Sequence, residues 1–382
     1  MPDLASKLPD VGTTIFTLMS QLAAEQGAIN LSQGFPDFEP PEALLERVNA
    51  HLYGGRNQYA PMIGVASLRE ATAAKIADLY GLDVDPDTEL TITSGATEAL
   101  FCAIAAVVRP GDEVIVFDPA YDSYEPVVRL HGGYTKHVPL QPPRYQIDWD
   151  QVASLVTART RLIITNTPHN PTGSIWRAAD IDALRQIVTG QDIYVLADEV
   201  YEHMVFDGAR HESLCRYPDL FARSFVVSSY GKTYHVTGWK IGYCAAPAAL
   251  SAEFRKIHQY VTFTSNTPVQ FGLADFLAAH PEHHQQLSQF YQAKRDLFLA
   301  ALESSRFAFA PSAGTYFQLL DYSQITEQLD TEWVTQLTCE AKVAAIPVSV
   351  FYRKPPAAQM IRLCFAKDDA TLQRGAEILC QL

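Results

Sequence analysis

The central part of the chain repeats one pattern that strongly limits its fold: a short apolar segment followed by a helical stretch. Apolar segments of this kind predict strands buried on both faces, and their alternation with helices predicts an α/β domain with a largely parallel sheet. The clearest examples are ELTIT (89–93), DEVIVFD (112–118), RLIIT (161–165), YVLAD (194–198) and SFVVSS (224–229).

The length and a later change of pattern predict two domains. A chain of 382 residues is longer than one hydrophobic core usually serves. After about residue 280, a long helical stretch precedes the strand segments TYFQLL and MIRLCFA, which indicates a smaller α+β domain. We expect an N-terminal arm over 1–41 that joins the small domain, a large domain over 42–280, and the small domain over 281–382.

Charge and composition disfavour several classes of protein. A formal net charge of −14 disfavours binding to nucleic acid or to an anionic membrane. The sequence shows no signal-peptide pattern and no apolar run long enough to span a bilayer. The six cysteines form neither a C-x-x-C pair nor a zinc-ligand spacing, so we expect reduced cysteines, no metal site and a cytoplasmic location.

One lysine stands out in the segment SSYGKTYHVTGWKIGY, which covers 228–243. Lys232 follows an apolar strand among small and hydroxyl residues, and low local polarity lowers the pKa of a lysine that forms a Schiff base. Lys240 is a second cation that can pair with a phosphate. A plain surface charge is the ordinary explanation of a single lysine, so Lys232 needs support from other segments.

An aspartate and a tyrosine lie at the end of an earlier strand segment, YVLADEVY. Asp198 lies where open α/β sheets place ligand groups, and a buried carboxylate there can keep the nitrogen of a pyridine ring protonated. Tyr201 can hydrogen-bond an oxygen on the same ring. The structural alternative is an aspartate that caps a helix, followed by a surface glutamate.

Two loops offer groups for a phosphate and for a ring oxygen. In TSGATEAL (93–100), the backbone N–H groups at a helix N-terminus and the Thr97 hydroxyl make an anion site, although a capped helix without ligand has the same pattern. In NTPHNPTG (166–173), Asn170 is held extended before Pro171, so its amide can donate to a phenolate oxygen. A structural Asn-Pro turn is the alternative.

A tyrosine and an arginine complete the set. Tyr121 follows a strand and can stack on a flat ring, although core packing explains a single tyrosine equally. Arg362 lies inside the apolar segment MIRLCFA, where an arginine needs a partner: either a bound carboxylate or an internal salt bridge. Together the segments supply what pyridoxal phosphate (PLP) and an amino-acid substrate require.

The same segments resemble a known family. The patterns SxxGKTxxxTGWKxG, NTPxNPxG, DEVY and IRLCFAKDDATL are similar to those of the class I/II aminotransferases of PLP fold type I, over nearly the whole chain. LSQGFPDFEPP and AAIPVSVFY fit the methionine aminotransferases and the kynurenine–oxoglutarate transaminases within that family.

The resemblance implies a role for each residue. Lys232 forms the Schiff base and carries the proton at the reacting carbon, Asp198 pairs with the ring nitrogen, and Tyr121 stacks on the ring. The remaining roles are ring-oxygen contacts by Tyr201 and Asn170, phosphate contacts by Gly95, Ala96, Ser229 and Lys240, and binding of the substrate carboxylate by Arg362, Asn170 and the Gly34 backbone.

The resemblance also implies a homodimer with shared active sites. Tyr59 is expected to reach the phosphate of the neighbouring subunit, while Phe16 and Phe263 line the side-chain pocket. Lys240 departs from the family, since many members carry arginine there; the charge is kept and the forked geometry is lost.

The predicted function is transfer of the amino group of methionine, or of another large apolar or aromatic amino acid such as kynurenine, to a 2-oxo acid by a ping-pong mechanism. One alternative is a cysteine-S-conjugate or cystathionine β-lyase, which uses the same lysine and cofactor. A second is a protein that binds PLP for regulation without turnover, which the full set of catalytic residues disfavours.

Overall fold

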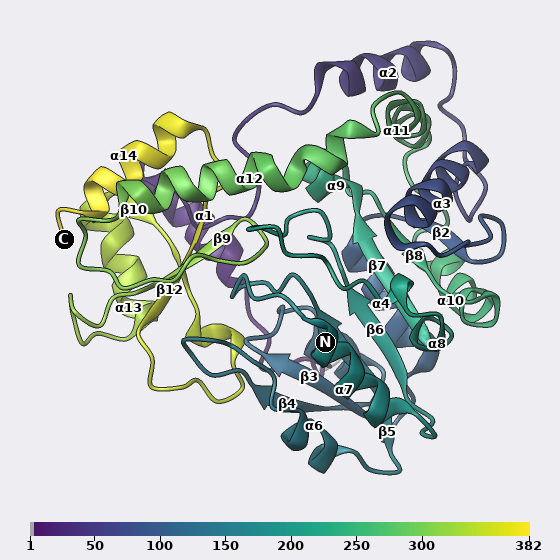
Figure 1. Cartoon of the computed structure of the whole chain (residues 1–382), viewed down its shortest axis with the longest axis horizontal. Coiled ribbons are helices and arrows are strands. Elements are labelled where there is room, and N and C mark those ends of the chain that lie inside the picture. The colour runs from purple at the N-terminus through teal and green to yellow at the C-terminus, as the bar shows by residue number, and fades with distance from the viewer. Residues whose placement is uncertain (1–3) are drawn as a thin grey trace.

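A seven-stranded sheet forms the centre of the larger part of the molecule in the computed structural model, which describes residues 4–382 (Figure 1). The strand order is β2-β8-β7-β6-β5-β3-β4, and β8 alone runs in the opposite direction to the other six strands. The predicted largely parallel sheet is therefore confirmed. The strands are β2 (Leu90–Thr93), β3 (Glu113–Asp118), β4 (Tyr134–Pro139), β5 (Thr160–Asn166), β6 (Tyr194–Asp198), β7 (Ser224–Ser229) and β8 (Gly242–Ala245).

Helices cover both faces of this sheet, as the continuous apolar strands require. Along β3, Val114 and Val116 pack into one hydrophobic cluster, whereas Ile115 and Phe117 pack into another on the opposite face. The first cluster includes α4 (Ala96–Val107), α5 (Tyr124–Leu130) and α10 (Ala248–Val261). The second includes α2 (Glu42–Tyr53), α3 (Ala66–Tyr80), α6 (Trp149–Leu155), α7 (Ala178–Val188), α8 (Pro218–Phe221) and α11 (Thr267–Ala279).

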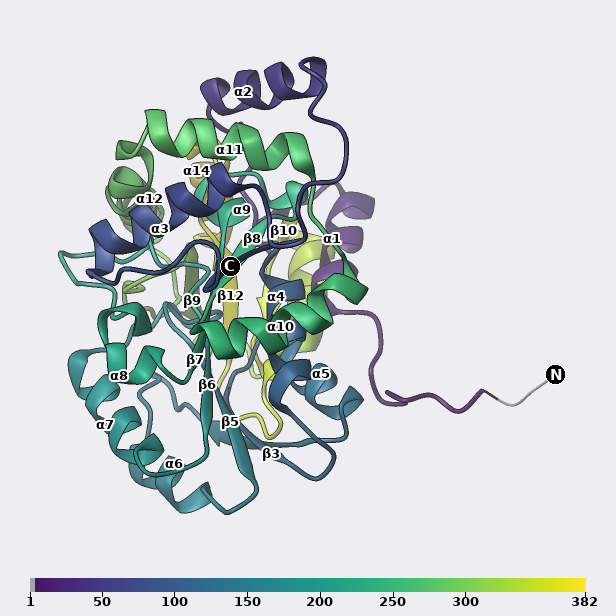
Figure 2. The same cartoon turned by 90° about the vertical axis from the view of Figure 1, so that its right-hand side faces the viewer.

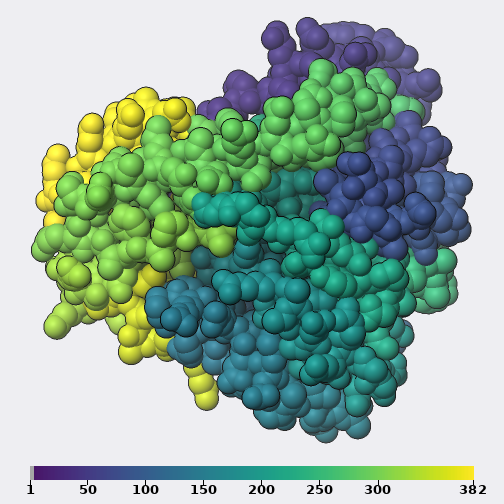
Figure 3. All heavy atoms as spheres, in the orientation of Figure 1, coloured from purple at the N-terminus to yellow at the C-terminus, as the bar shows by residue number. Residues whose placement is uncertain are grey.

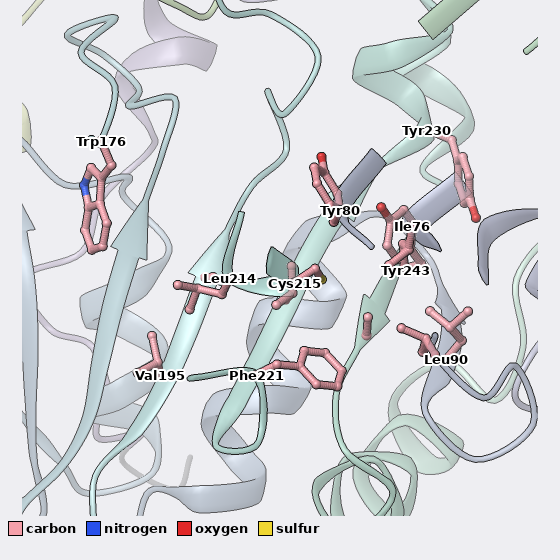
Figure 4. Close-up of a cluster of buried hydrophobic side chains, with 14 of the residues drawn as sticks. Ile76, Tyr80, Leu90, Trp176, Val195, Leu214, Cys215, Phe221, Tyr230 and Tyr243 are labelled. Atoms are coloured by element: carbon pink, nitrogen blue, oxygen red, sulfur yellow. The ribbon is translucent and has the colours of Figure 1, made fainter. Parts of the chain in front are cut away.

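Figure 4 shows part of the second cluster, where aromatic side chains from α3, β8 and the segment after β7 approach one another. Tyr230 and Tyr243 pack with ring centroids 5.4 Å apart. Tyr230 begins α9 (Tyr230–Thr233), the one-turn helix that carries Lys232. The second hydrophobic cluster therefore fixes the start of α9, the helix that carries Lys232.

A smaller lobe contains the C-terminal part of the chain, drawn in green and yellow in Figure 3. Its antiparallel sheet has the order β11-β12-β9 and packs in a third hydrophobic cluster. Its elements are β9 (Phe317–Asp321), β10 (Val343–Ala344), β11 (Ile346–Pro347), β12 (Met360–Cys364), α12 (Glu282–Ala301), α13 (Asp330–Gln336), a π-helical turn (Leu337–Ala341) and α14 (Asp369–Leu379). Short 3₁₀ turns lie at Leu214–Arg216, Thr237–Trp239 and Ser349–Phe351.

The N-terminal segment contacts this smaller lobe. Helix α1 (Ile15–Gln26) begins at the Thr14 cap and ends at Gly27, whose φ of 59° is the left-handed conformation that glycine adopts freely. Strand β1 (Ile29–Asn30) then pairs with β10 in parallel. Because α1 and β1 join the cluster of the small lobe, we propose the division into an arm (1–41), a large domain (42–280) and a small domain (281–382).

Residues 4–14, which precede α1, extend away from the body of the molecule (Figure 2). Their one ion pair joins Asp10 to Arg129 of α5 at 2.5 Å, within the described part of the chain. None of the helices across residues 4–382 is both long enough and apolar enough to cross a membrane.

Candidate active site

A cavity of about 360 Å³ lies where the ends of β5, β6 and β7 meet the start of α4 and strand β12 of the small lobe. All of the site residues predicted from the sequence line it except Tyr59 and Phe263. They are Phe16, Gly34, Gly95, Ala96, Thr97, Tyr121, Asn170, Asp198, Tyr201, Ser229, Lys232, Lys240 and Arg362. Parallel strands deliver their following loops to one edge, which explains the convergence.

The amine of Lys232 is held without a carboxylate partner within residues 4–382. Its Nζ donates to the backbone oxygen of Gly34 at 2.9 Å and to the hydroxyl of Tyr316 at 2.8 Å. Burial lowers the pKa of Lys232 from 10.5 to about 8. A buried lysine with a lowered pKa is neutral more often at neutral pH, as a nucleophilic amine must be.

Asp198 is buried at the end of β6, with 4% of its surface exposed. Its Oδ2 accepts a hydrogen bond from the Tyr124 hydroxyl at 2.6 Å, and its Oδ1 is 3.4 Å from the Val200 N–H. Burial raises the pKa of Asp198 from 3.8 to about 6. A buried carboxylate without a cation partner in the described chain is a suitable partner for a cationic ring nitrogen.

The structural alternative for this motif, a capping aspartate followed by a surface glutamate, is wrong for Glu199. Glu199 is not on the surface: 1% of it is exposed, and its two oxygens accept from the His211 Nε2 and the Leu214 N–H, both at 2.9 Å.

Arg362 is buried in β12 with 1% of its surface exposed. Its Nη1 donates to Asn170 Oδ1 at 2.9 Å and its Nη2 to the Ser32 backbone oxygen at 2.8 Å, whereas its Nε has no partner. Burial lowers the pKa of Arg362 from 12.5 to about 10.

The internal salt bridge considered for Arg362 is absent from residues 4–382, since no carboxylate lies within ion-pairing distance of its guanidinium. The Phe317 ring lies 3.9 Å from the guanidinium carbon, so apolar groups surround the charge. A buried cation that points into a cavity and lacks a counter-ion fits a carboxylate brought by a ligand.

The turn before α4 has the form of an anion site. Gly95 adopts a φ of 80° and ends β2's connection to the helix, so the first N–H groups of α4 open into the cavity. A Cβ on Gly95 would lie 3.3 Å from Lys240 Nζ, and one on Gly242 would lie 3.0 Å from the Ala96 nitrogen. The close packing places Lys240 beside the N-terminus of α4. The lysine cation and the free N–H groups of the helix together suit a bound phosphate.

Asn166 holds the loop that carries Asn170. Its Nδ2 donates to the Asp198 backbone oxygen at 2.9 Å, and its Oδ1 accepts from the Asn170 N–H at 2.9 Å. The amide of Asn170 is thereby fixed between Arg362 and the end of β6.

Two aromatic side chains stand at the same cavity. Tyr121 packs edge to face on Tyr124, with ring centroids 5.7 Å apart. Tyr201 packs in the same way on Tyr316 at 5.1 Å and on Phe317 at 5.8 Å. Neighbouring rings therefore fix the orientation of both tyrosines.

Tyr59 and Phe263 lie outside the cavity of their own chain. Their rings meet edge to face at 5.5 Å, and 83% of Tyr59 and 45% of Phe263 are exposed. The sequence prediction that Phe263 lines the side-chain pocket is therefore not met within one subunit, and it requires a neighbour, as the prediction for Tyr59 does.

Sequence reasoning missed several residues of the site, notably Tyr124, Asn166 and Tyr316. Asn166 begins the quoted NTPHNPTG motif, so a signal was present. Tyr124 lies three residues after Tyr121, and Tyr316 lies in the predicted strand segment TYFQLL, but neither was assigned a role, because only the folded chain brings them to Asp198 and Lys232.

A larger cavity of about 970 Å³ opens between the two lobes. It shares Asn166 with the first cavity, but Lys232, Asp198 and Arg362 do not line it. The chemistry therefore belongs to the smaller cavity.

The residues of the smaller cavity fit PLP on structural grounds. Within residues 4–382, neither the amine of Lys232 nor the carboxylate of Asp198 has an ion-pair partner. Together with the helix N-terminus beside Lys240, they match the aldehyde, ring nitrogen and phosphate of that cofactor. The unpartnered Nε of Arg362 leaves a donor for a substrate carboxylate.

Comparisons with known proteins agree with this geometry. The sequence profile of the family "Aminotransferase class I and II" matches residues 26–379. The chain is 55% identical over 377 residues to a methionine aminotransferase of Escherichia coli (strain K12), covering 99% of this chain and 98% of that protein. A crystal structure of an Escherichia coli methionine aminotransferase superposes with a TM-score of 0.98 at 54% identity and covers 100% of both chains.

A more distant relative points to a second substrate class within the family. A kynurenine–oxoglutarate transaminase of Dictyostelium discoideum is 33% identical, covering 97% of this chain and 94% of that protein. The resemblance read from the motifs is thus confirmed: the chain belongs to the class I and II aminotransferases, and it is a transaminase that uses pyridoxal phosphate.

Proposed function

We propose that this transaminase moves the amino group of methionine, or of another large apolar or aromatic amino acid such as kynurenine, to a 2-oxo acid by a ping-pong mechanism. The observation that carries the proposal is the buried guanidinium of Arg362, which has no counter-ion in residues 4–382 and shares one cavity with the Lys232 amine. Full-length identity of 55% to a methionine aminotransferase supports the choice of donor.

The lining of the cavity supports an apolar side chain on the donor. Phe16, Phe35 and Phe317 line it, and Phe16 stacks on Phe351 with centroids 5.5 Å apart. Besides Arg362, the cations in the lining supplied by residues 4–382 are Lys232 and Lys240, which are engaged by the cofactor in this proposal. A donor with a second carboxylate therefore finds no further cation in this chain's part of the pocket.

Each residue has a defined task in the proposal. Bound PLP supplies an electron sink for the pair of electrons left when the proton departs from the substrate Cα. Lys232 would hold the cofactor covalently through its amine, and its Nζ, once released, would carry the proton that leaves the substrate Cα. Asp198 keeps the ring nitrogen protonated, and Arg362 fixes the substrate carboxylate.

The remaining groups orient the ring. Tyr121 would stack on it, and Tyr201 and Asn170 would hydrogen-bond its oxygen. The phosphate is bound by Gly95, Ala96, Thr97, Ser229 and Lys240, while the Gly34 backbone and Phe16 complete the substrate pocket.

A homodimer with shared sites is part of the same proposal. Tyr59 and Phe263 form an exposed aromatic pair, which suits a contact with the cavity of a second copy. In the dimer, Tyr59 reaches the neighbour's phosphate and Phe263 the neighbour's side-chain pocket. We also propose a cytoplasmic location, on the basis of the free cysteines within the described chain.

A donor-by-acceptor activity panel tests the proposal. We expect 2-oxo acid from methionine, phenylalanine or kynurenine, and little from aspartate or glutamate as first donor. Release of pyruvate and ammonia from cystathionine without an acceptor, in place of transamination, would instead establish a β-lyase. A lack of 2-oxo acid from all apolar and aromatic donors would refute the proposed substrate class.

A further inference from the structure

A buried cluster of Glu98, Cys102 and His258 lies directly behind the phosphate turn. Glu98 is in the first turn of α4, and its Oε2 accepts from the Ser94 N–H at 3.0 Å. Its Oε1 accepts from His258 at 2.7 Å and from the Cys102 thiol at 3.0 Å. None of the His258 side chain and 8% of the Glu98 side chain is exposed, so solvent is largely excluded from the cluster.

The hydrogen-bond geometry fixes the net charge of the Glu98–His258 pair. His258 Nδ1 faces Glu98 Oε1, and His258 Nε2 lies 2.9 Å from the Met62 backbone oxygen. The Met62 carbonyl oxygen can only accept, so Nε2 carries a proton and donates it. The contact between Nδ1 and Glu98 Oε1 needs a second proton, which the two groups share. Whether the imidazole or the carboxyl carries that proton, the pair has a net charge of zero.

Charge neutrality matters because of where Glu98 lies. The N-terminus of a helix attracts a carboxylate in its first turn and a bound phosphate through the same dipole and N–H groups. An uncompensated carboxylate there would repel a phosphate across a low-dielectric interior, where charges interact strongly.

His258 also contacts the segments that carry the exposed aromatic pair, one through its backbone and one through its side chain. His258 lies in the last turn of α10, and its backbone oxygen accepts from the Phe263 N–H at 3.1 Å. On the other side, its Nε2 holds Met62, three residues after Tyr59. The His258 side chain thus joins the phosphate turn of its own subunit to the segment that carries Tyr59, while its backbone oxygen holds Phe263.

We propose that His258 is a positioning residue: it neutralises Glu98 so that the Ser94–Ala96 turn binds the cofactor phosphate, and it ties that turn to the Tyr59–Phe263 pair. The link to the second subunit rests on the proposed shared-site dimer. The ligand atoms of Glu98, Cys102 and His258 also lie within 4.8 Å of one another, as in a metal site. Their hydrogen bonds account for that grouping without an ion.

The test compares PLP with pyridoxal, which lacks the phosphate. Cofactor-free wild type, His258→Gln and the double variant Glu98→Gln/His258→Gln are titrated with each compound, and the dissociation constant is measured by absorbance. In His258→Gln the carboxylate of Glu98 is left uncompensated, so we expect about tenfold weaker binding of PLP with little change for pyridoxal. The double variant removes the charge as well and should recover most of the PLP affinity.

Two further variants keep the test decisive. His280→Gln removes an exposed His–Glu pair (Nδ1 to Glu282 Oε1, 3.1 Å) far from the phosphate turn in sequence, and it should leave both affinities unchanged. Glu98→Ala leaves the Ser94 N–H without its acceptor, so PLP affinity should fall selectively even if His258→Gln does not fold.

Equal losses for PLP and pyridoxal, or an unchanged PLP affinity, would overturn the inference, as would a double variant no better than His258→Gln. The proposed function is judged separately, on the wild type: if that protein transaminates while the variants bind PLP normally, only the role of His258 fails.

Discussion

Replacing Arg362 with methionine removes a charge that the fold buries without pairing. The two possible roles of Arg362, a structural salt bridge or substrate binding, predict different effects of this substitution on stability and on activity. A structural arginine stabilises the empty protein, whereas a binding arginine costs stability until its ligand arrives.

The structure gives the size of both terms. Burial that lowers the pKa of Arg362 from 12.5 to about 10 corresponds to roughly 3 kcal/mol for keeping the charge in the interior. The substitution also loses the guanidinium's hydrogen bonds to Asn170 and Ser32, each worth about 1.5 kcal/mol, the lower end of the range for a charged donor. These terms nearly cancel, so we expect the free energy of unfolding of the cofactor-free enzyme to change by less than about 1 kcal/mol.

Activity should respond very differently. Loss of a charge-assisted, two-pronged contact to the substrate carboxylate removes roughly 3 to 4 kcal/mol, which is on the order of a 10²- to 10³-fold fall in kcat/KM for methionine. The measurements are steady-state transamination of methionine and thermal unfolding of the cofactor-free protein.

Arg295 offers a matched control, since it is a buried arginine with carboxylate partners. It donates to both oxygens of Asp207 at 2.7 and 2.8 Å and lies in α12, outside the cavity. Arg295→Met should lower stability by about 2 kcal/mol and leave kcat/KM nearly unchanged. If Arg362→Met instead behaves like Arg295→Met, with lost stability and retained kcat/KM, the substrate-binding role is wrong.

Three other predictions address the remaining parts of the site. Lys232→Ala should abolish the absorbance band of the lysine-bound cofactor and lower activity by at least about a thousandfold; borohydride reduction of the wild type followed by peptide mapping should label Lys232, and a label elsewhere would refute the assignment. Because burial raises the folded-state pKa of Asp198 to about 6, the stability that this carboxyl contributes is present below about pH 4 and is lost as pH rises through 6. In thermal unfolding of the cofactor-free protein from pH 4 to 7.5, Asp198→Asn should therefore lose less stability than wild type. Equal losses would show that burial does not raise the pKa of Asp198. Mixing inactive Lys232→Ala subunits with Tyr59→Ala subunits should restore activity, because one site of the mixed dimer has an intact Lys232 and an intact Tyr59; no recovery above that of each variant alone would argue against shared sites.

The sequence predicted most of the fold because the strands of the large sheet are apolar along their whole length. That pattern requires helices on both faces, and it located β3, β5, β6 and β7 together with the residues at their carboxyl ends. Lys232, Asp198 and Asn170 could therefore be assigned to one cavity before their distances were known. Helix α1 also has local sequence signals at its ends, since it begins at a threonine cap and ends at a glycine.

Side-chain partners were decided by tertiary structure alone. The sequence left Arg362 open between an internal salt bridge and a bound carboxylate, and the answer depends on which residues surround β12 in the folded chain. His258 shows the same limit: its hydrogen bonds reach residues 160 and 196 positions away, Glu98 and Met62. Local patterns of apolar and polar residues fix which elements form and which faces are buried, because those depend on neighbours in the sequence. The partner of a buried charge depends on packing between distant segments, and that is set only when the whole chain folds.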